Sequence, residues 1–228
     1  LHTADTLAIP LRQGTLLLSA LPLYPAGDTP LLLDGTIALL GDSPILQLLL
    51  TARGVDLLQA ISAPSPHTLL YGKALVDGNI TLSGPLDDLT LRGYLHLLHG
   101  SAIRYIYRNA LLTSGNHLDR VVTFVSFNAD STATAPTKAL TPRTFTLDLD
   151  IEIDPTVEVE ASIGQSQQNS AQLQGGGMLS LQYTPTLGLH LAGTYTIGSG
   201  HLMANIPLFH ASRMTLRPSS TLTWTGNP

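Results

Sequence analysis

The chain has 228 residues, enough for one large domain or two small ones with a sizeable core. Charged residues make up only 12% and the net charge is −5, so there is no basic excess of the kind that attracts nucleic acid or anionic lipid headgroups. The absence of cysteine excludes disulfide bonds and thiolate zinc sites. No apolar run approaches the roughly 18 to 20 residues that span a bilayer as a helix, and residues 1–10 do not read as a signal peptide. We therefore expect a soluble chain or a piece of a longer protein.

The apolar content is dominated by leucine, which supplies 45 of the 228 residues, whereas aromatic residues supply 5%. Compact cores normally use aromatic rings to fill volume. A sheet whose apolar residues are Leu, Ile and Val with few rings is consistent with a smooth apolar surface. The alternative interpretation is an ordinary β-core that is rich in leucine.

In chain order, the run from Ile45 to Thr51 is too uniformly apolar for its periodicity to distinguish helix from strand. The best helix candidate is a single short segment, Leu57 to Ile61, which Asp56 would cap. Apolar residues then alternate with polar ones before Gly84-Pro85 and again over 89–97. Glycines at spacings of roughly 6 to 10 residues predict successive short strands separated by turns.

The clearest signal lies at 145–163, where every odd residue is apolar and every even residue is polar. A period of two over this length predicts a β-strand with one buried apolar face and one solvent-exposed polar face. We expect the strand to break near Asp154-Pro155, because proline cannot donate to a β-ladder.

The same alternation returns at 179–197 and near the C-terminus at 214–224. Two segments rich in small and polar residues, 128–142 and 165–177, are expected to be loops, with Gly175 to Gly177 as a flexible turn. The sequence thus predicts an all-β fold with almost no helix. Its apolar face must be covered either by closing into a sandwich or barrel, or by curling into an elongated open trough, and the strand lengths favour the trough.

Residues 72–105, GKALVDGNITLSGPLDDLTLRGYLHLLHGSAIRY, resemble the repeating units of TamB and its AsmA-like relatives. The C-terminal part is more specific. Leu191, Gly193, Tyr195, Ile197 and Gly200, followed by Ser220, Leu222, Trp224, Gly226 and Pro228, are similar to two signatures of TamB C-terminal domains, particularly those of Bacteroidetes.

The resemblance implies a β-taco, a long sheet curled into an open trough with an apolar interior. The resemblance covers about 72–228, whereas 1–71 match only in general texture. Together with the loop expected at 128–142, it divides the chain into Leu-rich repeats (1–71), β-taco repeats (72–127), the loop and a truncated C-terminal domain (143–228). It also implies a fragment of a periplasmic protein of a Gram-negative bacterium, whose inner-membrane anchor lies outside this chain. The implied role is outer-membrane biogenesis, by carrying phospholipid or by assisting barrel assembly with an Omp85-type partner.

Local chemical motifs are weak. Four carboxylates, Asp148, Asp150, Glu152 and Asp154, could form a calcium or general-acid site, but a solvated strand face explains them better. His96 and His99 would lie on opposite faces of a strand, which argues against a metal pair. Trp224 reads as a packing anchor. We expect no enzymatic activity and no cofactor.

The candidate site is instead the apolar face itself, because acyl chains gain free energy on burial without directional partners. Its predicted residues are Leu82, Leu91, Leu95, Leu97, Leu147, Leu149, Ile151, Ile153, Val157, Val159, Leu179, Leu181, Leu189 and Leu191. Three functions compete: a conduit for phospholipid acyl chains, a scaffold for nascent barrel strands acting by β-augmentation, and a β-helix enzyme or adhesin acting on polysaccharide. The scarcity of aromatic residues, none clustered with acids, argues against the third.

Overall fold

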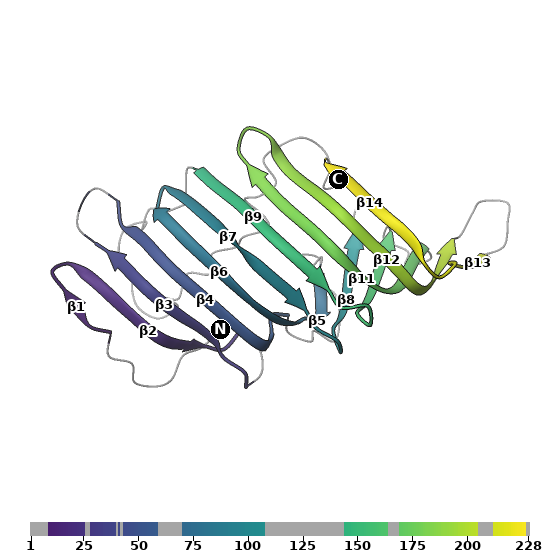
Figure 1. Ribbon diagram of the computed structural model, residues 1–228, viewed down its shortest axis with the longest axis horizontal. Coiled ribbons are helices and arrows are strands. Elements are labelled where there is room, and N and C mark those ends of the chain that lie inside the picture. Colours follow the sequence, from purple (N-terminus) through teal and green to yellow (C-terminus); the bar gives the residue numbers. More distant parts are fainter. Residues whose placement is uncertain are drawn as a thin grey trace, which may run out of the picture.

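A computed structural model describes residues 9–25, 28–39, 41, 43–58, 70–107, 144–163, 169–204 and 212–226. Within these residues there is no helix, and 14 strands form one sheet whose members lie side by side in a long row (Figure 1). The strands are β1 (Leu11–Arg12), β2 (Thr15–Leu23), β3 (Leu31–Ala38), β4 (Ile45–Asp56), β5 (Leu70–Lys73), β6 (Leu75–Pro85), β7 (Asp88–Leu97), β8 (Ala102–Tyr107), β9 (Thr144–Ile153), β10 (Glu158–Ile163), β11 (Asn169–Thr184), β12 (Gly188–Ala204), β13 (Ser212–Thr215) and β14 (Ser220–Gly226).

The strand order is β1-β2-β3-β4-β6-β7-β9-β11-β10-β8-β5, with β12 on the other edge of β11 and with β13 and β14 on β12. Most neighbours are antiparallel, but β7 pairs with β9 and β8 pairs with β10 in parallel. The long strand β11 pairs first with β10 and then with β9 along one edge, so the sheet has two tiers. The sheet is open and does not close into a barrel, which confirms the predicted all-β, trough-like fold.

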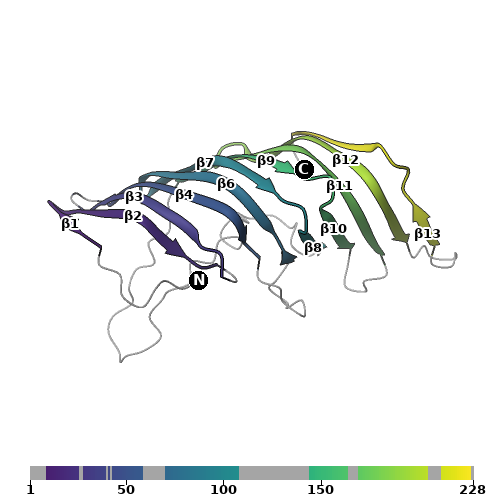
Figure 2. The ribbon, with the colours of Figure 1, turned by 60° about the horizontal axis from the view of Figure 1, so that its bottom comes forward.

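The two tiers meet at a bend that crosses the strands, which we call the crease. It runs through 52–55 on β4, 74 between β5 and β6, 98–101 between β7 and β8, 154–157 between β9 and β10, and 174–175 on β11. We call the line of parallel pairing, β7 with β9 and β8 with β10, the parallel seam. It keeps its register through the bend, because Leu97 pairs with Ile153 before the bend and Ala102 pairs with Glu158 after it. Figure 2 shows the strands arching over this line.

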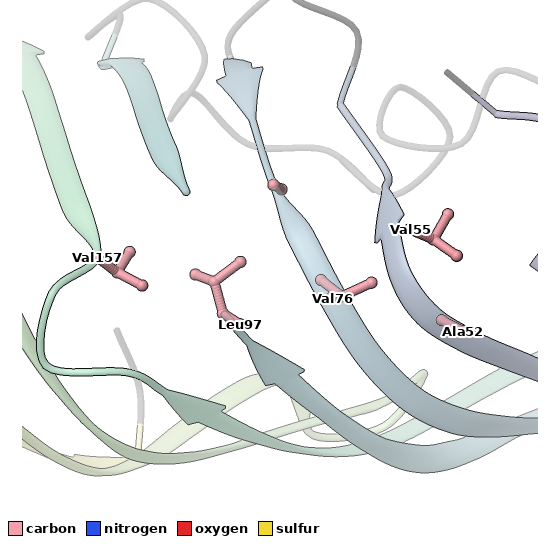
Figure 3. Packing of buried hydrophobic residues seen from close by; sticks show 6 residues of the cluster. Ala52, Val55, Val76, Leu97 and Val157 are labelled. Atoms are coloured by element: carbon pink, nitrogen blue, oxygen red, sulfur yellow. The ribbon is translucent and has the colours of Figure 1, made fainter. Parts of the chain in front are cut away.

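The hydrophobic core lies along the crease. Ala52, Val55, Ala74, Val76, Leu97 and Val157 form its buried cluster. The five of these side chains that Figure 3 labels stand in a row on the concave side of the bent strands. Every pair of strands in close contact within the described residues is a pair of hydrogen-bonded neighbours, so these residues supply no second layer. Burial is therefore greatest where the sheet bends over itself.

Side-chain oxygens satisfy the backbone groups that bending removes from the ladders. Asp34 accepts the Ala20 N–H at the bulge of β2, and Asp77 accepts the Gly54 N–H at the bulge of β4. The Ser101 hydroxyl accepts the Leu75 N–H at 3.0 Å and donates to the Leu75 carbonyl at 3.3 Å. Ser101 is only 2% exposed, so an unpaired backbone group there would be costly.

Several glycines that the sequence suggested as turns lie inside strands. Gly93 is in the middle of β7, and a Cβ there would lie 2.3 Å from the Asn79 carbonyl oxygen. Residues 169–177, expected to belong to a loop, instead form the first half of β11. A Cβ on Gly177 would lie 2.0 Å from the Thr194 carbonyl oxygen. At both positions the backbone of the neighbouring strand occupies the space that a side chain would need.

The structure also tests the predictions made for residues 45–51, 154–155 and 57–61. The run 45–51 is the strand β4, and the predicted break at Asp154-Pro155 is confirmed, since β9 ends at Ile153 and β10 begins at Glu158. The prediction of a helix at 57–61 is wrong for its first two residues, Leu57 and Leu58, which are not helical. Leu57 donates to the Ala74 carbonyl, and Leu58 donates to the Asp56 carboxylate in a turn. Residues 59–61 and the loop predicted at 128–142 lie outside the described residues.

Candidate functional site

The register of the strands puts apolar side chains on one face of the sheet, which we call the inner face. Residues that are paired across a ladder share a face, so three rows can be followed from strand to strand. The rows are Leu48–Leu82–Leu91–Leu147–Tyr183–Leu189, then Leu50–Ile80–Gly93–Leu149–Leu181–Leu191, then Ala52–Gly78–Leu95–Ile151–Leu179–Gly193.

All fourteen candidate residues lie on this face. Twelve of them belong to the three rows above or to the next row, Val76–Leu97–Ile153–Gly177–Tyr195. Val157 lies in the core cluster at the crease, and Val159 packs against that cluster. The predicted alternation in 145–163 is thus confirmed for 145–153, where Asp148 and Asp150 occupy the opposite, outer face.

The inner face is only partly shielded from solvent. Val157 is fully buried at the crease, whereas Leu149, Ile151 and Leu181 farther up the sheet are half-buried. Leu189, on β12, is more open still, because it is 43% exposed. A closed sandwich would bury all of them, so the described residues form an open trough wall rather than a closed core.

Sequence reasoning missed the N-terminal part of this face and its most buried aromatic residue. Leu48 and Leu50 continue the rows, but their segment is apolar at nearly every position. Only the pairing shows that Leu49, 39% exposed, faces outward. Tyr195 is 4% exposed and its hydroxyl has no hydrogen-bond partner. Burial raises the pKa of Tyr195, so its phenol remains neutral.

The charged residues of the central strands lie on the outer face and pair across the parallel seam. Arg92 lies 3.9 Å from Asp148, and Arg104 lies 3.0 Å from Glu160. Tyr94 donates a hydrogen bond to Glu152, and that hydrogen bond raises the pKa of Tyr94. These pairs are largely solvated, so they contribute little to stability.

The carboxylates and histidines noted in the sequence are not gathered into one site. Asp148 accepts a hydrogen bond from Gln182 at 3.1 Å, and Asp154 accepts two from Thr156 in the turn at the crease. His96 lies on β7, while His99 lies in the turn after it rather than on a strand. Among the described residues, no three His, Cys, Asp or Glu side chains come together as a metal site.

The outer face of the lower tier carries a polar depression of about 500 Å³. Arg104, Glu160, Gln172, His201 and Arg213 line it, and the Ser199 hydroxyl donates to Gln174 beside it. Glu158 and Glu160 also line it beside Arg104, and none of its described lining residues is Phe, Tyr or Trp.

Comparison with known families identifies this arrangement. The family model for the TamB C-terminal domain matches residues 24–228. The chain belongs to the TamB C-terminal domain family. Neither the curated proteins nor the solved structures gave a match.

TamB proteins are Gram-negative envelope proteins that act in outer-membrane biogenesis. The match covers nearly all of the described sheet, including the N-terminal strands β3 and β4, where the sequence alone showed only a general likeness. The part of the chain that the structure describes contains no helix with the length and apolarity needed to cross a bilayer.

Proposed function

We propose that this TamB-family sheet is a non-enzymatic conduit whose inner face holds phospholipid acyl chains and carries them through the periplasm from the inner to the outer membrane. In this proposal the full-length protein is anchored in the inner membrane. The observation that carries the proposal is the set of rows on the inner face in which Leu and Ile predominate, interrupted only by small residues and Tyr183, and which no other described element covers.

The physical argument rests on the repetition of equivalent positions. Each buried CH₂ group gains about 0.8 kcal/mol and needs no directional partner. From β2 to β14 the inner face crosses nine strands, which at about 4.8 Å per step gives a track of roughly 40 Å. A tail moving along the track exchanges one apolar contact for a similar one, so no single position traps it.

The polar groups are arranged consistently with this role. The seam residues Arg92, Asp148, Arg104 and Glu160 are all on the outer face, where they remain hydrated. Headgroups would stay at the open side of the trough while the tails cover the leucine rows, since burying an ionised group costs several kcal/mol.

Photo-crosslinking tests the proposal with residues that are matched by register. A photoreactive amino acid at Leu149 or Leu181, which pair on the inner face, should crosslink to phospholipid acyl chains. The same probe at Asp148 or Gln182, which pair one step away on the outer face, should not. Equal labelling of both faces, or no labelling of the inner face, would refute the conduit.

A second candidate is a scaffold for outer-membrane barrel strands, with an Omp85-type barrel as partner. The free edge of β14 favours it. Within the described chain β14 pairs only with β12, and Ser220–Gly226 contains neither charge nor proline. At the other end of the sheet, β2 carries a bulge with Ala20 at a φ of 45° and also Pro22, features that block strand addition.

Hydrogen exchange tests the scaffold. An added peptide with the alternating pattern of a barrel strand should protect β14 amides by β-augmentation and leave β2 amides unchanged. If β14 amides exchange at the same rate with and without the peptide, the scaffold function is wrong.

A further inference from the structure

The turn between β11 and β12 presents an unusually exposed leucine. Leu187 is 86% exposed, the highest value among the large hydrophobic residues that the structure describes. Its backbone N–H donates to the Thr184 hydroxyl at 3.2 Å, and Pro185 restricts the same turn. The turn therefore holds the leucine side chain out from the rim of the sheet.

The hairpin that carries this leucine contains no acidic side chain, no lysine and no arginine. No Asp, Glu, Lys or Arg occurs between Glu160 and Arg213, a segment that includes all of β11 and β12. The β6–β7 turn on the same rim differs, because it carries Asp87 and Asp88. Inserting the β11–β12 tip into an apolar medium would thus desolvate no charge, whereas inserting the other turn would desolvate two.

Two more features suit an interface between water and lipid. The backbone of the hairpin is paired up to its last residues, Thr184 with Gly188, so the tip exposes few unsatisfied groups. Just below the rim on the inner face, the rings of Phe145 and Tyr183 lie 6.5 Å apart. Tyrosine side chains concentrate at the headgroup level of membranes.

From these observations we infer that the β11–β12 tip is a membrane-contact site, at which Leu187 inserts into the surface of a lipid bilayer. The partner is a bilayer and not a charged ligand, because the tip offers an apolar side chain with no Asp, Glu, Lys or Arg beside it. The site lies at the rim, away from the crease, and the inference stands even if the inner face carries no lipid. Figure 1 shows this hairpin in green at the C-terminal end of the sheet.

Single-cysteine labelling provides the test, since the natural chain has no cysteine. An environment-sensitive dye on Leu187→Cys should shift to the blue, and be quenched by lipid-borne quenchers, when phosphatidylcholine–phosphatidylethanolamine vesicles are added. The dye on Asp87→Cys, on the other turn, or on Met178→Cys, exposed on the outer face of the same hairpin, should not respond.

A charge substitution at the tip gives the quantitative test. Leu187→Asp should lower vesicle binding about tenfold or more, the effect of losing one buried leucine side chain, while Leu187→Phe retains binding. The unfolding midpoint of both variants should equal that of the parent, because the side chain is almost fully exposed. Binding should also be insensitive to salt.

Three results would overturn the inference: no spectral shift at Leu187→Cys, an equal shift at Asp87→Cys, or protection of the tip by a protein and not by vesicles. Crosslinking of phospholipid at Leu149 should be the same in Leu187→Asp and in the parent. A result that refutes membrane contact at the tip can therefore be distinguished from a result that refutes the lipid conduit on the inner face.

Discussion

A carboxylate placed at the crease should unfold the sheet, whereas the same carboxylate placed higher on the inner face should be tolerated. Val157 and Ile151 provide the comparison. Both lie on the inner face in the same stretch of chain, but Val157 is fully buried in the core cluster and Ile151 is half-buried between Leu95 and Leu179.

The magnitudes differ for a physical reason. Val157→Asp removes an apolar side chain worth about 2 kcal/mol and buries an unpaired charge, so we expect a loss of about 4 kcal/mol or more in the free energy of unfolding. Ile151→Asp loses about 1 kcal/mol of partial apolar burial, and water at the open side of the trough can still hydrate its carboxylate. Phospholipid crosslinking should nevertheless fall in Ile151→Asp, because the charge lies in the path of the tails.

Urea denaturation followed by the fluorescence of Trp224, the single tryptophan, measures both variants. Val157→Thr serves as a control that keeps the side-chain volume and adds only a hydroxyl, with an expected loss of about 1 to 3 kcal/mol. If Ile151→Asp unfolds the chain as severely as Val157→Asp, the inner face is a closed core and the conduit is wrong. If neither substitution destabilises the chain, the crease does not hold the core.

Three further outcomes follow from the crease. Ser101→Ala should cost about 1 to 3 kcal/mol in urea denaturation, because the Leu75 N–H loses its partner, while the Leu75 carbonyl keeps the Leu98 N–H. Gly177→Ala should speed amide exchange along the β11–β12 ladder. Gly198→Ala should not, since its nearest neighbour would lie at 3.4 Å from the new Cβ. The hydrogen bonds from Thr156 lower the pKa of Asp154, so this turn is stabilised above the unfolded-state pKa of Asp154 and loses that stabilisation as pH falls through the lowered value. An NMR titration should show the pKa of Asp154 rising in Thr156→Ala, and an unchanged value would contradict this account.

Strand identity and the two faces of the sheet could be predicted from local pattern. Alternation over 145–163 assigned Leu149 and Ile151 to one face and Asp148 and Asp150 to the other, because successive side chains of a strand point in opposite directions. Proline chemistry likewise located the break near Asp154-Pro155, since β9 ends at Ile153. These inferences need only the covalent geometry of an extended chain, so they hold whatever the neighbouring strands are.

The crease and the parallel seam are decided by tertiary structure. No local signal in 88–107 or 144–163 indicates that these segments lie beside each other in register, since the choice of neighbour depends on pairing between distant residues. Gly93 and Gly177 read as turn residues in sequence, yet both lie within strands where another backbone approaches too closely for a side chain. Alternation determines which way a side chain points, but only the bending of the whole sheet determines whether it becomes buried core, like Val157, or open wall, like Ile151.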